Sequence, residues 1–108
     1  MINIKEIDVL TLKNKIDQNA DFILIDVREN QEIKICKLKE SIHIPMREIP
    51  DNIDKINNKK TVVIMCKSGA RSAQVCHYLN EQGYPNVYNL KGGIIDWALT
   101  IDQTMDIY

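Results

Sequence analysis

The sequence predicts an α/β fold in which buried parallel strands alternate with helices. Two short runs, residues 22–27 and 61–66, are dominated by β-branched and other large apolar residues without polar alternation. This pattern is typical of strands that are covered on both faces. After the second run, Val75, Cys76 and Leu79 form an apolar stripe at helical spacing. Because parallel strands need a crossover connection, a helix is expected between them.

The remaining elements are expected in order along the chain. A helix is predicted over residues 9–17, with Asp8 as its N-cap. The helix that carries the apolar stripe should run from about Ser72 to Gln82, with Gln74, His77 and Glu81 facing away from the core and Gly83 as the C′ residue. A further strand is expected at residues 87–90, a tight turn at Gly92-Gly93, and short helical turns at residues 31–35, 47–56 and 94–99.

Length and composition indicate one ordinary globular domain. The chain has 108 residues, which is room for a single domain over residues 1–108, with a core at about 6–98 and a short C-terminal tail at 101–108. The apolar fraction of 44% and the charged fraction of 27% exclude a disordered polymer and a membrane protein. The net charge of -1 gives no reason to expect a nucleic-acid or membrane partner. The N-terminal residues do not resemble a signal peptide, so a cytoplasmic location is expected.

The three cysteines do not predict a disulfide scaffold or a zinc site. Cys36, Cys66 and Cys76 are odd in number, have no CxxC spacing, and are accompanied by only two histidines. We therefore expect no metal and no cofactor, and a reduced thiol that is available for chemistry. Cys76 falls on the apolar stripe and is expected to be core.

The most informative segment surrounds the second cysteine. It reads Met65-Cys66-Lys67-Ser68-Gly69-Ala70-Arg71-Ser72. The buried strand delivers Cys66 to its carboxyl end, outside which ligands bind in open α/β sheets. A helix N-terminus, inward-facing loop amides, and the cations Lys67 and Arg71 would all favour a thiolate there. A strand-end cysteine is often only a small buried hydrophobe, but this combination predicts a nucleophile.

The same segment resembles the active-site loop of the rhodanese-like domain family, in which a cysteine, four residues and an arginine join a strand to a helix. Three other segments are similar to family motifs and occur in the expected order: Asp26-Val27-Arg28 with Glu32, His43-Ile44-Pro45, and Leu90-Lys91-Gly92-Gly93 with Trp97. The resemblance runs from about Glu6 to Ala98. It implies a central, mainly parallel five-stranded sheet flanked by helices on both faces.

The resemblance also implies sulfur transfer. In that family the loop cysteine attacks a sulfane sulfur, becomes a persulfide, and passes the outer sulfur to a nucleophilic acceptor. Cys66 would be the nucleophile, and its substrate would be bound by Lys67, Ser68, Gly69, Ala70, Arg71 and Ser72. Asp26 and Arg28 would support the loop, although a structural ion pair at the strand end is an equal alternative.

The expected partners follow from this chemistry. The donor would be a small anion such as thiosulfate, and the acceptor a small thiophile or a protein thiol or dithiol. The tail from Ile101 to Tyr108 has no clear period. It could fray, cover a sheet edge or mediate a weak dimer, so both a monomer and a weak homodimer remain open.

One segment departs from the family pattern. Where the family usually has Gly-His-Ile-x-Gly-Ala, this chain reads Cys36-Lys37-Leu38-Lys39-Glu40-Ser41. Because glycine supplies positive φ at little cost, the turn is expected to be either reshaped or slightly strained. Cys36, in place of the first glycine, is expected to take no part in the chemistry.

Two other functions compete with a free sulfurtransferase. A non-catalytic or sulfur-carrier module would use the same loop to receive sulfur from one protein and hand it to another, or would only bind a partner. A cysteine-dependent phosphatase also places a Cys…Arg loop between a strand and a helix. Its loop has five intervening residues, whereas four separate Cys66 from Arg71 here, so a pocket for a single sulfur is the better fit.

Overall fold

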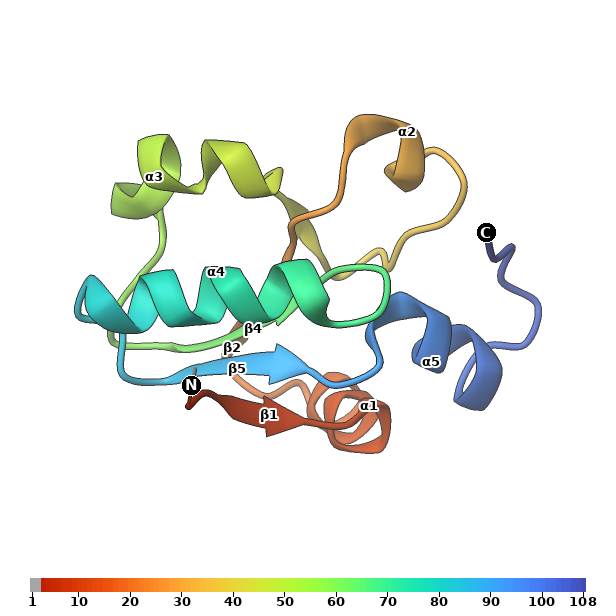
Figure 1. Cartoon of the computed structure of the whole chain (residues 1–108). Helices are drawn as coiled ribbons and strands as arrows, with labels where there is room; N and C mark the ends of the chain where they lie inside the picture. Colours follow the sequence, from red (N-terminus) through yellow and green to blue (C-terminus); the bar gives the residue numbers. More distant parts are fainter. Residues whose placement is uncertain (1–2) are drawn as a thin grey trace.

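Five parallel strands form one sheet in the order β1-β5-β4-β2-β3, and helices cover both of its faces (Figure 1). The computed structural model describes residues 3–108. The strands are β1 (Lys5–Ile7), β2 (Phe22–Asp26), β3 (Ile42–His43), β4 (Thr61–Met65) and β5 (Val87–Leu90). The helices are α1 (Val9–Asp17), α2 (Asn30–Ile33), α3 (Ile49–Asn52), α4 (Ala70–Glu81) and α5 (Gly93–Thr100), with 3-10 turns at Met46–Glu48 and Ile53–Lys55. All neighbouring strands run parallel, which confirms the predicted fold class.

The central strand β4 divides the core into two layers. Val62, Ile64 and Cys66 pack with side chains of α3 and α4, whereas Val63 and Met65 pack with side chains of α1 and α5. Figure 1 shows these two pairs of helices on opposite sides of the sheet. Because side chains alternate between the faces of a strand, the register of β4 brings Cys66 out on the side of α4.

Several predicted elements are confirmed at their bounds. The helix over residues 9–17 is α1, and its N-cap Asp8 accepts a hydrogen bond of 2.8 Å from the backbone N–H of Thr11. The strand at residues 87–90 is β5. Gly83 follows α4 with φ of +93°, in agreement with its predicted C′ role. The two buried strands at residues 22–27 and 61–66 are each one residue shorter than predicted.

The helix predicted from about Ser72 begins two residues earlier, at Ala70. Gly69 caps it with φ of +109°, a conformation that glycine adopts without steric cost. The early start matters for the site, because it brings the first turn of α4 directly over the end of β4. The apolar stripe of Val75, Cys76 and Leu79 is buried as predicted.

The other predictions agree in part. The short helical turns predicted at residues 47–56 are present as two 3-10 turns that flank the four-residue α3, with Pro50 in its first turn. The turn predicted at 31–35 is α2, which begins at Asn30 and ends at Ile33. The edge strand β1 was missed, because three residues are too few to show a periodic pattern.

The turn at residues 36–41 is reshaped rather than strained. Within residues 3–108, Asn19 is the one non-glycine residue with positive φ, so none of the six residues takes a glycine-like conformation. The turn is closed instead by Ser41, whose backbone N–H and hydroxyl both donate to the carbonyl of Leu38, at 3.0 and 2.7 Å. A left-handed glycine is therefore not needed at this position.

No helix among residues 3–108 combines the length and the apolar character needed to cross a membrane. The core is dominated by aliphatic side chains from both layers, and Trp97 of α5 is buried in the second layer.

Candidate active site

The sulfur of Cys66 lies in a cradle of backbone amides at the carboxyl end of β4. Its Sγ accepts hydrogen bonds from the backbone N–H groups of Gly69, at 3.1 Å, and Ser72, at 3.4 Å. The side chain is 1% exposed. Two inward-pointing N–H groups and the N-terminus of a twelve-residue helix place partial positive charge on this sulfur. The arrangement stabilises negative charge at Sγ or at an atom bonded to it.

Two of the loop amides contact the sulfur of Cys66 itself. Of the amides from Lys67 to Ser72, those of Gly69 and Ser72 reach Sγ within hydrogen-bond distance. The N–H groups of Ala70 and Arg71 belong to the first turn of α4 and have no carbonyl partner inside the helix. They are therefore suited to an atom placed beyond Sγ.

The N-terminus of α5 holds the other side of the loop. The backbone N–H groups of Ile94 and Ile95 donate to the carbonyls of Cys66, at 3.0 Å, and Lys67, at 3.1 Å. Within one peptide group the C=O and the N–H point in opposite directions. Because α5 binds the carbonyls of Cys66 and Lys67, the N–H groups of the same two peptide groups point away from α5. The bonds explain the glycine at the start of α5, since a side chain at Gly93 would meet these two carbonyls.

A chain of polar side chains reaches the sulfur from the sheet. Ser72 Oγ lies 3.2 Å from Cys66 Sγ, and the Ser72 hydroxyl donates to Asn89 Oδ1 in β5. The amide nitrogen of Asn89 in turn donates to the carbonyl of Gly69, at 3.1 Å, and to Glu6, at 3.0 Å. Between Cys66 Sγ and Ser72 Oγ, either atom can be the donor. Sequence reasoning missed Asn89, which has no motif signal apart from its place in a strand.

The charge of Arg71 is neutralised by Glu32. The guanidinium makes a bidentate pair with the carboxylate, at 2.7 and 2.9 Å, and so does not project freely toward a substrate. Hydrogen bonds from Arg71 lower the pKa of Glu32 to about 2, and hydrogen bonds to Glu32 raise the pKa of Arg71. The expectation that both loop cations add net positive charge therefore holds only for Lys67.

Asp26 and Arg28 form an ion pair in the interior. Both side chains are fully buried, and Arg28 Nη2 lies 2.8 Å from Asp26 Oδ2. Burial opposes the charge on Arg28, but hydrogen bonds to Asp26 and Tyr108, together with their Coulombic attraction, outweigh burial and raise its pKa. Arg28 also donates to the carbonyl of Cys36, at 2.8 Å, and within residues 3–108 it makes no hydrogen bond to the Cys66 loop. Of the two predicted alternatives, the contacts match pairing with a carboxylate rather than contact with the loop.

Tyr108 joins the site from the far end of the chain. Its hydroxyl donates to Glu32 Oε2, at 2.6 Å, and accepts from Arg28 Nη1, at 2.9 Å. The Nζ atom of Lys67 lies 4.4 Å from the centroid of the Tyr108 ring. Figure 1 shows the chain returning from α5 toward this side of the molecule. No sequence signal indicated this contact, because the tail has no periodic pattern.

Within the described part of the chain, the other two cysteines lack the amide cradle that surrounds Cys66. Cys76 is fully buried in α4, and burial raises the pKa of its thiol to about 12. Cys36 lies at the reshaped turn, with its sulfur 3.8 Å from Arg28 Nη1. All three cysteines are unpaired, so Cys66 alone combines a reduced thiol with an amide cradle among the described residues.

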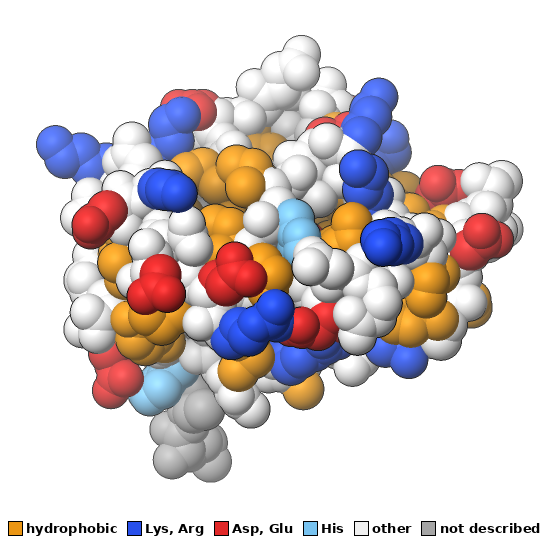
Figure 2. Space-filling model, turned by 90° about the horizontal axis from the view of Figure 1, so that it is seen from above, with side chains coloured by type: hydrophobic (Ala, Val, Ile, Leu, Met, Phe, Trp, Pro, Cys, Tyr) orange, Lys and Arg blue, Asp and Glu red, His pale blue; other side chains and the backbone are white. Residues whose placement is uncertain are grey.

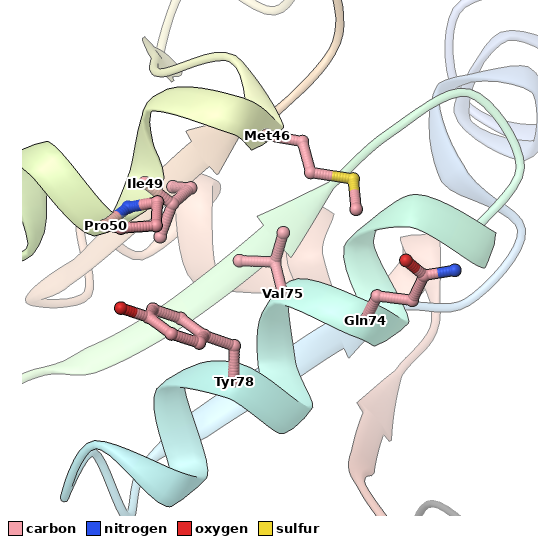
Figure 3. Close-up of a pocket in the computed structure, with 6 residues that line it drawn as sticks. All are labelled: Met46, Ile49, Pro50, Gln74, Val75 and Tyr78. Carbon is pink, nitrogen blue, oxygen red and sulfur yellow. The ribbon is translucent and has the colours of Figure 1, made fainter.

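A separate hollow lies between α3 and α4. It has a volume of about 250 Å³ and is lined by Met46, Ile49, Pro50, Gln74, Val75 and Tyr78, whose side chains converge in Figure 3. The lining is mostly apolar and lacks a nucleophile. On the face shown in Figure 2, hydrophobic side chains occur in small groups separated by charged ones. These surfaces supply no chemistry that competes with the Cys66 loop.

The family model of the rhodanese-like domain matches residues 8–100 of this chain. The chain belongs to the rhodanese-like domain family. A Bacillus subtilis protein named as a sulfurtransferase, YtwF, is 41% identical over 96 residues, covering 89% of this chain and 92% of that protein. A sulfurtransferase of Allochromatium vinosum is 42% identical over 95 residues, covering 88% of this chain and 89% of that protein.

Solved structures agree with this family assignment. The crystal structure of a rhodanese-like domain protein from Staphylococcus aureus superposes with a TM-score of 0.84 at 32% identity, covering 97% of this chain and 99% of that one. Together the relatives support a rhodanese-type role in sulfur transfer for this rhodanese-like chain.

Proposed function

We propose that this rhodanese-like protein is a sulfurtransferase that carries sulfane sulfur as a persulfide on Cys66. The observation that supports it best is the pair of backbone N–H groups, from Gly69 and Ser72, that point at Cys66 Sγ. The Cys66 thiolate attacks in one half-reaction and leaves in the other, and a cradle of fixed N–H dipoles stabilises its charge at no cost in reorganisation.

In the first half-reaction the Cys66 thiolate attacks the outer sulfur of thiosulfate. A new bond forms between the two sulfurs, the bond between the outer sulfur and the sulfonate group breaks, and sulfite leaves with the bonding electron pair. The outer sulfur of the persulfide then carries the negative charge. We expect the amides of Ala70 and Arg71, which have no partner inside α4, to stabilise that charge.

In the second half-reaction a nucleophilic acceptor attacks the outer sulfur. The bond from that sulfur to the acceptor forms, and the Cys66 thiolate leaves with the electron pair of the broken S–S bond. Cyanide would yield thiocyanate, and a protein thiol would yield a new persulfide.

Because its cysteines are all unpaired, we expect the protein to work in a reducing compartment such as the cytoplasm.

Mass spectrometry of the protein after exposure to thiosulfate tests the proposal. We expect Cys66 to gain about 32 Da, the mass of one sulfur atom, and dithiothreitol to remove it by thiol exchange. Cys66→Ala should lose both this gain and thiosulfate:cyanide turnover. Cys36→Ala should keep both, which makes it the matched control. Turnover retained in Cys66→Ala would reject the proposal.

The same samples separate the competing functions. A carrier would acquire the persulfide from a cysteine desulfurase but show negligible thiosulfate:cyanide turnover. Hydrolysis of a nitrophenyl phosphate ester that disappears in Cys66→Ser would instead indicate a phosphatase.

A further inference from the structure

Of the three cations Arg28, Lys67 and Arg71 around the Cys66 loop, Lys67 alone has no carboxylate partner in the described structure. Arg71 is paired with Glu32, and Arg28 is paired with Asp26. Among residues 3–108, no carboxylate lies within 4.0 Å of the Lys67 ammonium. An approaching anion therefore meets two neutralised pairs and one uncompensated cation. The position of Lys67 decides how strongly the site attracts that anion.

Tyr108 fixes that position. Lys67 has a long side chain with many rotamers, but its ammonium lies over the Tyr108 ring, 4.4 Å from the centroid. The ring itself is immobilised by hydrogen bonds of its hydroxyl to Glu32 and Arg28. Ile101 and Met105 secure the rest of the segment by packing on the core layer that contains Trp97.

We infer that Tyr108 is a positioning residue that holds the Lys67 ammonium beside the Cys66 loop and thereby makes the site selective for anionic sulfur donors. The inference rests on the proposed function, since it names the donor class of the same site. The contact is a cation–π interaction with the ring face, which does not neutralise the cation as a carboxylate would. Lys67 therefore stays charged while its side chain is restrained.

Alkylation of Cys66 measures the local charge without any sulfur transfer. Iodoacetate is an anion, and iodoacetamide is its neutral analogue. Peptide mass spectrometry follows both reactions at Cys66 and gives the ratio of the iodoacetate rate to the iodoacetamide rate. This ratio should fall about two- to fivefold in Tyr108→Leu, because a cation–π contact of this kind changes the population of the restrained side-chain conformation by that factor. Tyr108→Phe keeps the ring but loses the hydroxyl bonds that immobilise it, so it should restore the ratio in part. Tyr88→Leu serves as the control, since Tyr88 contacts Lys5 at 5.5 Å, away from the loop.

The inference requires that Tyr108 change the ratio of alkylation rates only by way of the Lys67 side chain. Lys67→Gln should lower the ratio by itself, and adding Tyr108→Leu to it should change the ratio no further. In turnover with thiosulfate, Tyr108→Leu should raise KM and leave kcat nearly unchanged. An unaltered ratio in Tyr108→Leu, or an equal fall in the Lys67→Gln background, would overturn the inference.

The outcomes separate this inference from the proposed function. If the ratio responds as expected but thiosulfate gives no persulfide on Cys66, the proposed function fails and the selectivity for anions stands. If neither reagent modifies Cys66 in the folded protein, the inference fails, whereas the proposed function is still decided by the persulfide that thiosulfate forms. Should Tyr108→Leu not fold, NMR of the unmodified protein decides: the Lys67 ε protons should be shifted upfield by the Tyr108 ring, and an ordinary shift would contradict the contact.

Discussion

Gly93 lies so close to the backbone of Lys67 that a Cβ atom on Gly93 would come within 2.3 Å of the Lys67 carbonyl oxygen. The contact joins the start of α5 to the Cys66 loop, which α5 also holds through hydrogen bonds from Ile94 and Ile95. The Gly-Gly turn at the start of α5 therefore helps to orient the amides of the Cys66 loop, although it is distant from Cys66 in the sequence.

Gly93→Ala should disturb the loop and lower the free energy of unfolding by more than its backbone conformation alone explains. The matched control is Gly83→Ala. Gly83 also has a positive φ, +93° compared with +60° for Gly93, but a Cβ atom on Gly83 would meet nothing within 4 Å. The control should cost about 1–2 kcal/mol, the steric penalty of a left-handed residue. Gly93→Ala should cost clearly more in urea titrations and should reduce sulfur transfer, and equal losses would refute the role of the contact.

Ser72→Ala should slow the attack of Cys66. When the thiol ionises, the Ser72 hydroxyl can turn its proton from Asn89 toward the sulfur, which lies 3.2 Å away. A hydrogen bond to a charged group contributes about 1.5–3 kcal/mol, so kcat/KM for thiosulfate should fall about 10- to 100-fold. Ser41→Ala, which removes a hydroxyl at the distant turn, controls for the substitution itself. Turnover equal to the wild type would show that the backbone amides suffice.

The fold was predictable because its signals are local. Residues 9–17 carry a helical stripe and an Asp8 cap, and β4 is an uninterrupted apolar run. The strand β1 and the start of α4 were not predicted correctly, because each depends on a partner elsewhere. β1 is defined by pairing with β5, and α4 begins early because Gly69 adopts a left-handed conformation.

The site was predictable only in its contiguous part. The loop from Cys66 to Ser72 is continuous in sequence, and strand, glycine and helix start together indicate its chemistry. Glu32, Asn89 and Tyr108 come from segments far from the loop, and which side chain meets which depends on the tertiary packing. The sequence therefore suggested a positively charged Arg71, whereas its pairing with Glu32 shows a neutralised one.

Arg28→Gln should destabilise the fold strongly. It would leave the Asp26 carboxylate in the interior without its cation, and both side chains are fully buried. Breaking a buried pair in this way costs about 3–5 kcal/mol. The surface pair of Lys13 and Asp17 provides the comparison, since Lys13→Gln should cost less than about 1 kcal/mol. Urea titrations of the two variants measure both values, and similar small losses would show that Asp26 finds other partners.

Acid should weaken the fold through Glu32. Hydrogen bonds from Arg71 hold its pKa at about 2 in the folded protein, below the ordinary value of 4.5. Because the folded state binds this proton less readily than the unfolded chain, the stabilisation is complete above about pH 4.5 and is lost as the pH falls toward 2.

The comparison of wild type with Glu32→Gln isolates this contribution from the other carboxylates. The difference in their free energies of unfolding should shrink by about 1–2 kcal/mol on acidification, a range that allows for solvent screening of a partly exposed pair. Urea titrations at several pH values between 7 and 2.5 measure it.

In an Arg71→Gln background the same substitution should leave the pH dependence nearly unchanged, because the main cause of the lowered pKa has been removed. Parallel stability curves for wild type and Glu32→Gln would mean that the Arg71 pair does not bias the protonation of Glu32, and the charge assignment that leaves Lys67 as the uncompensated cation would have to be revised.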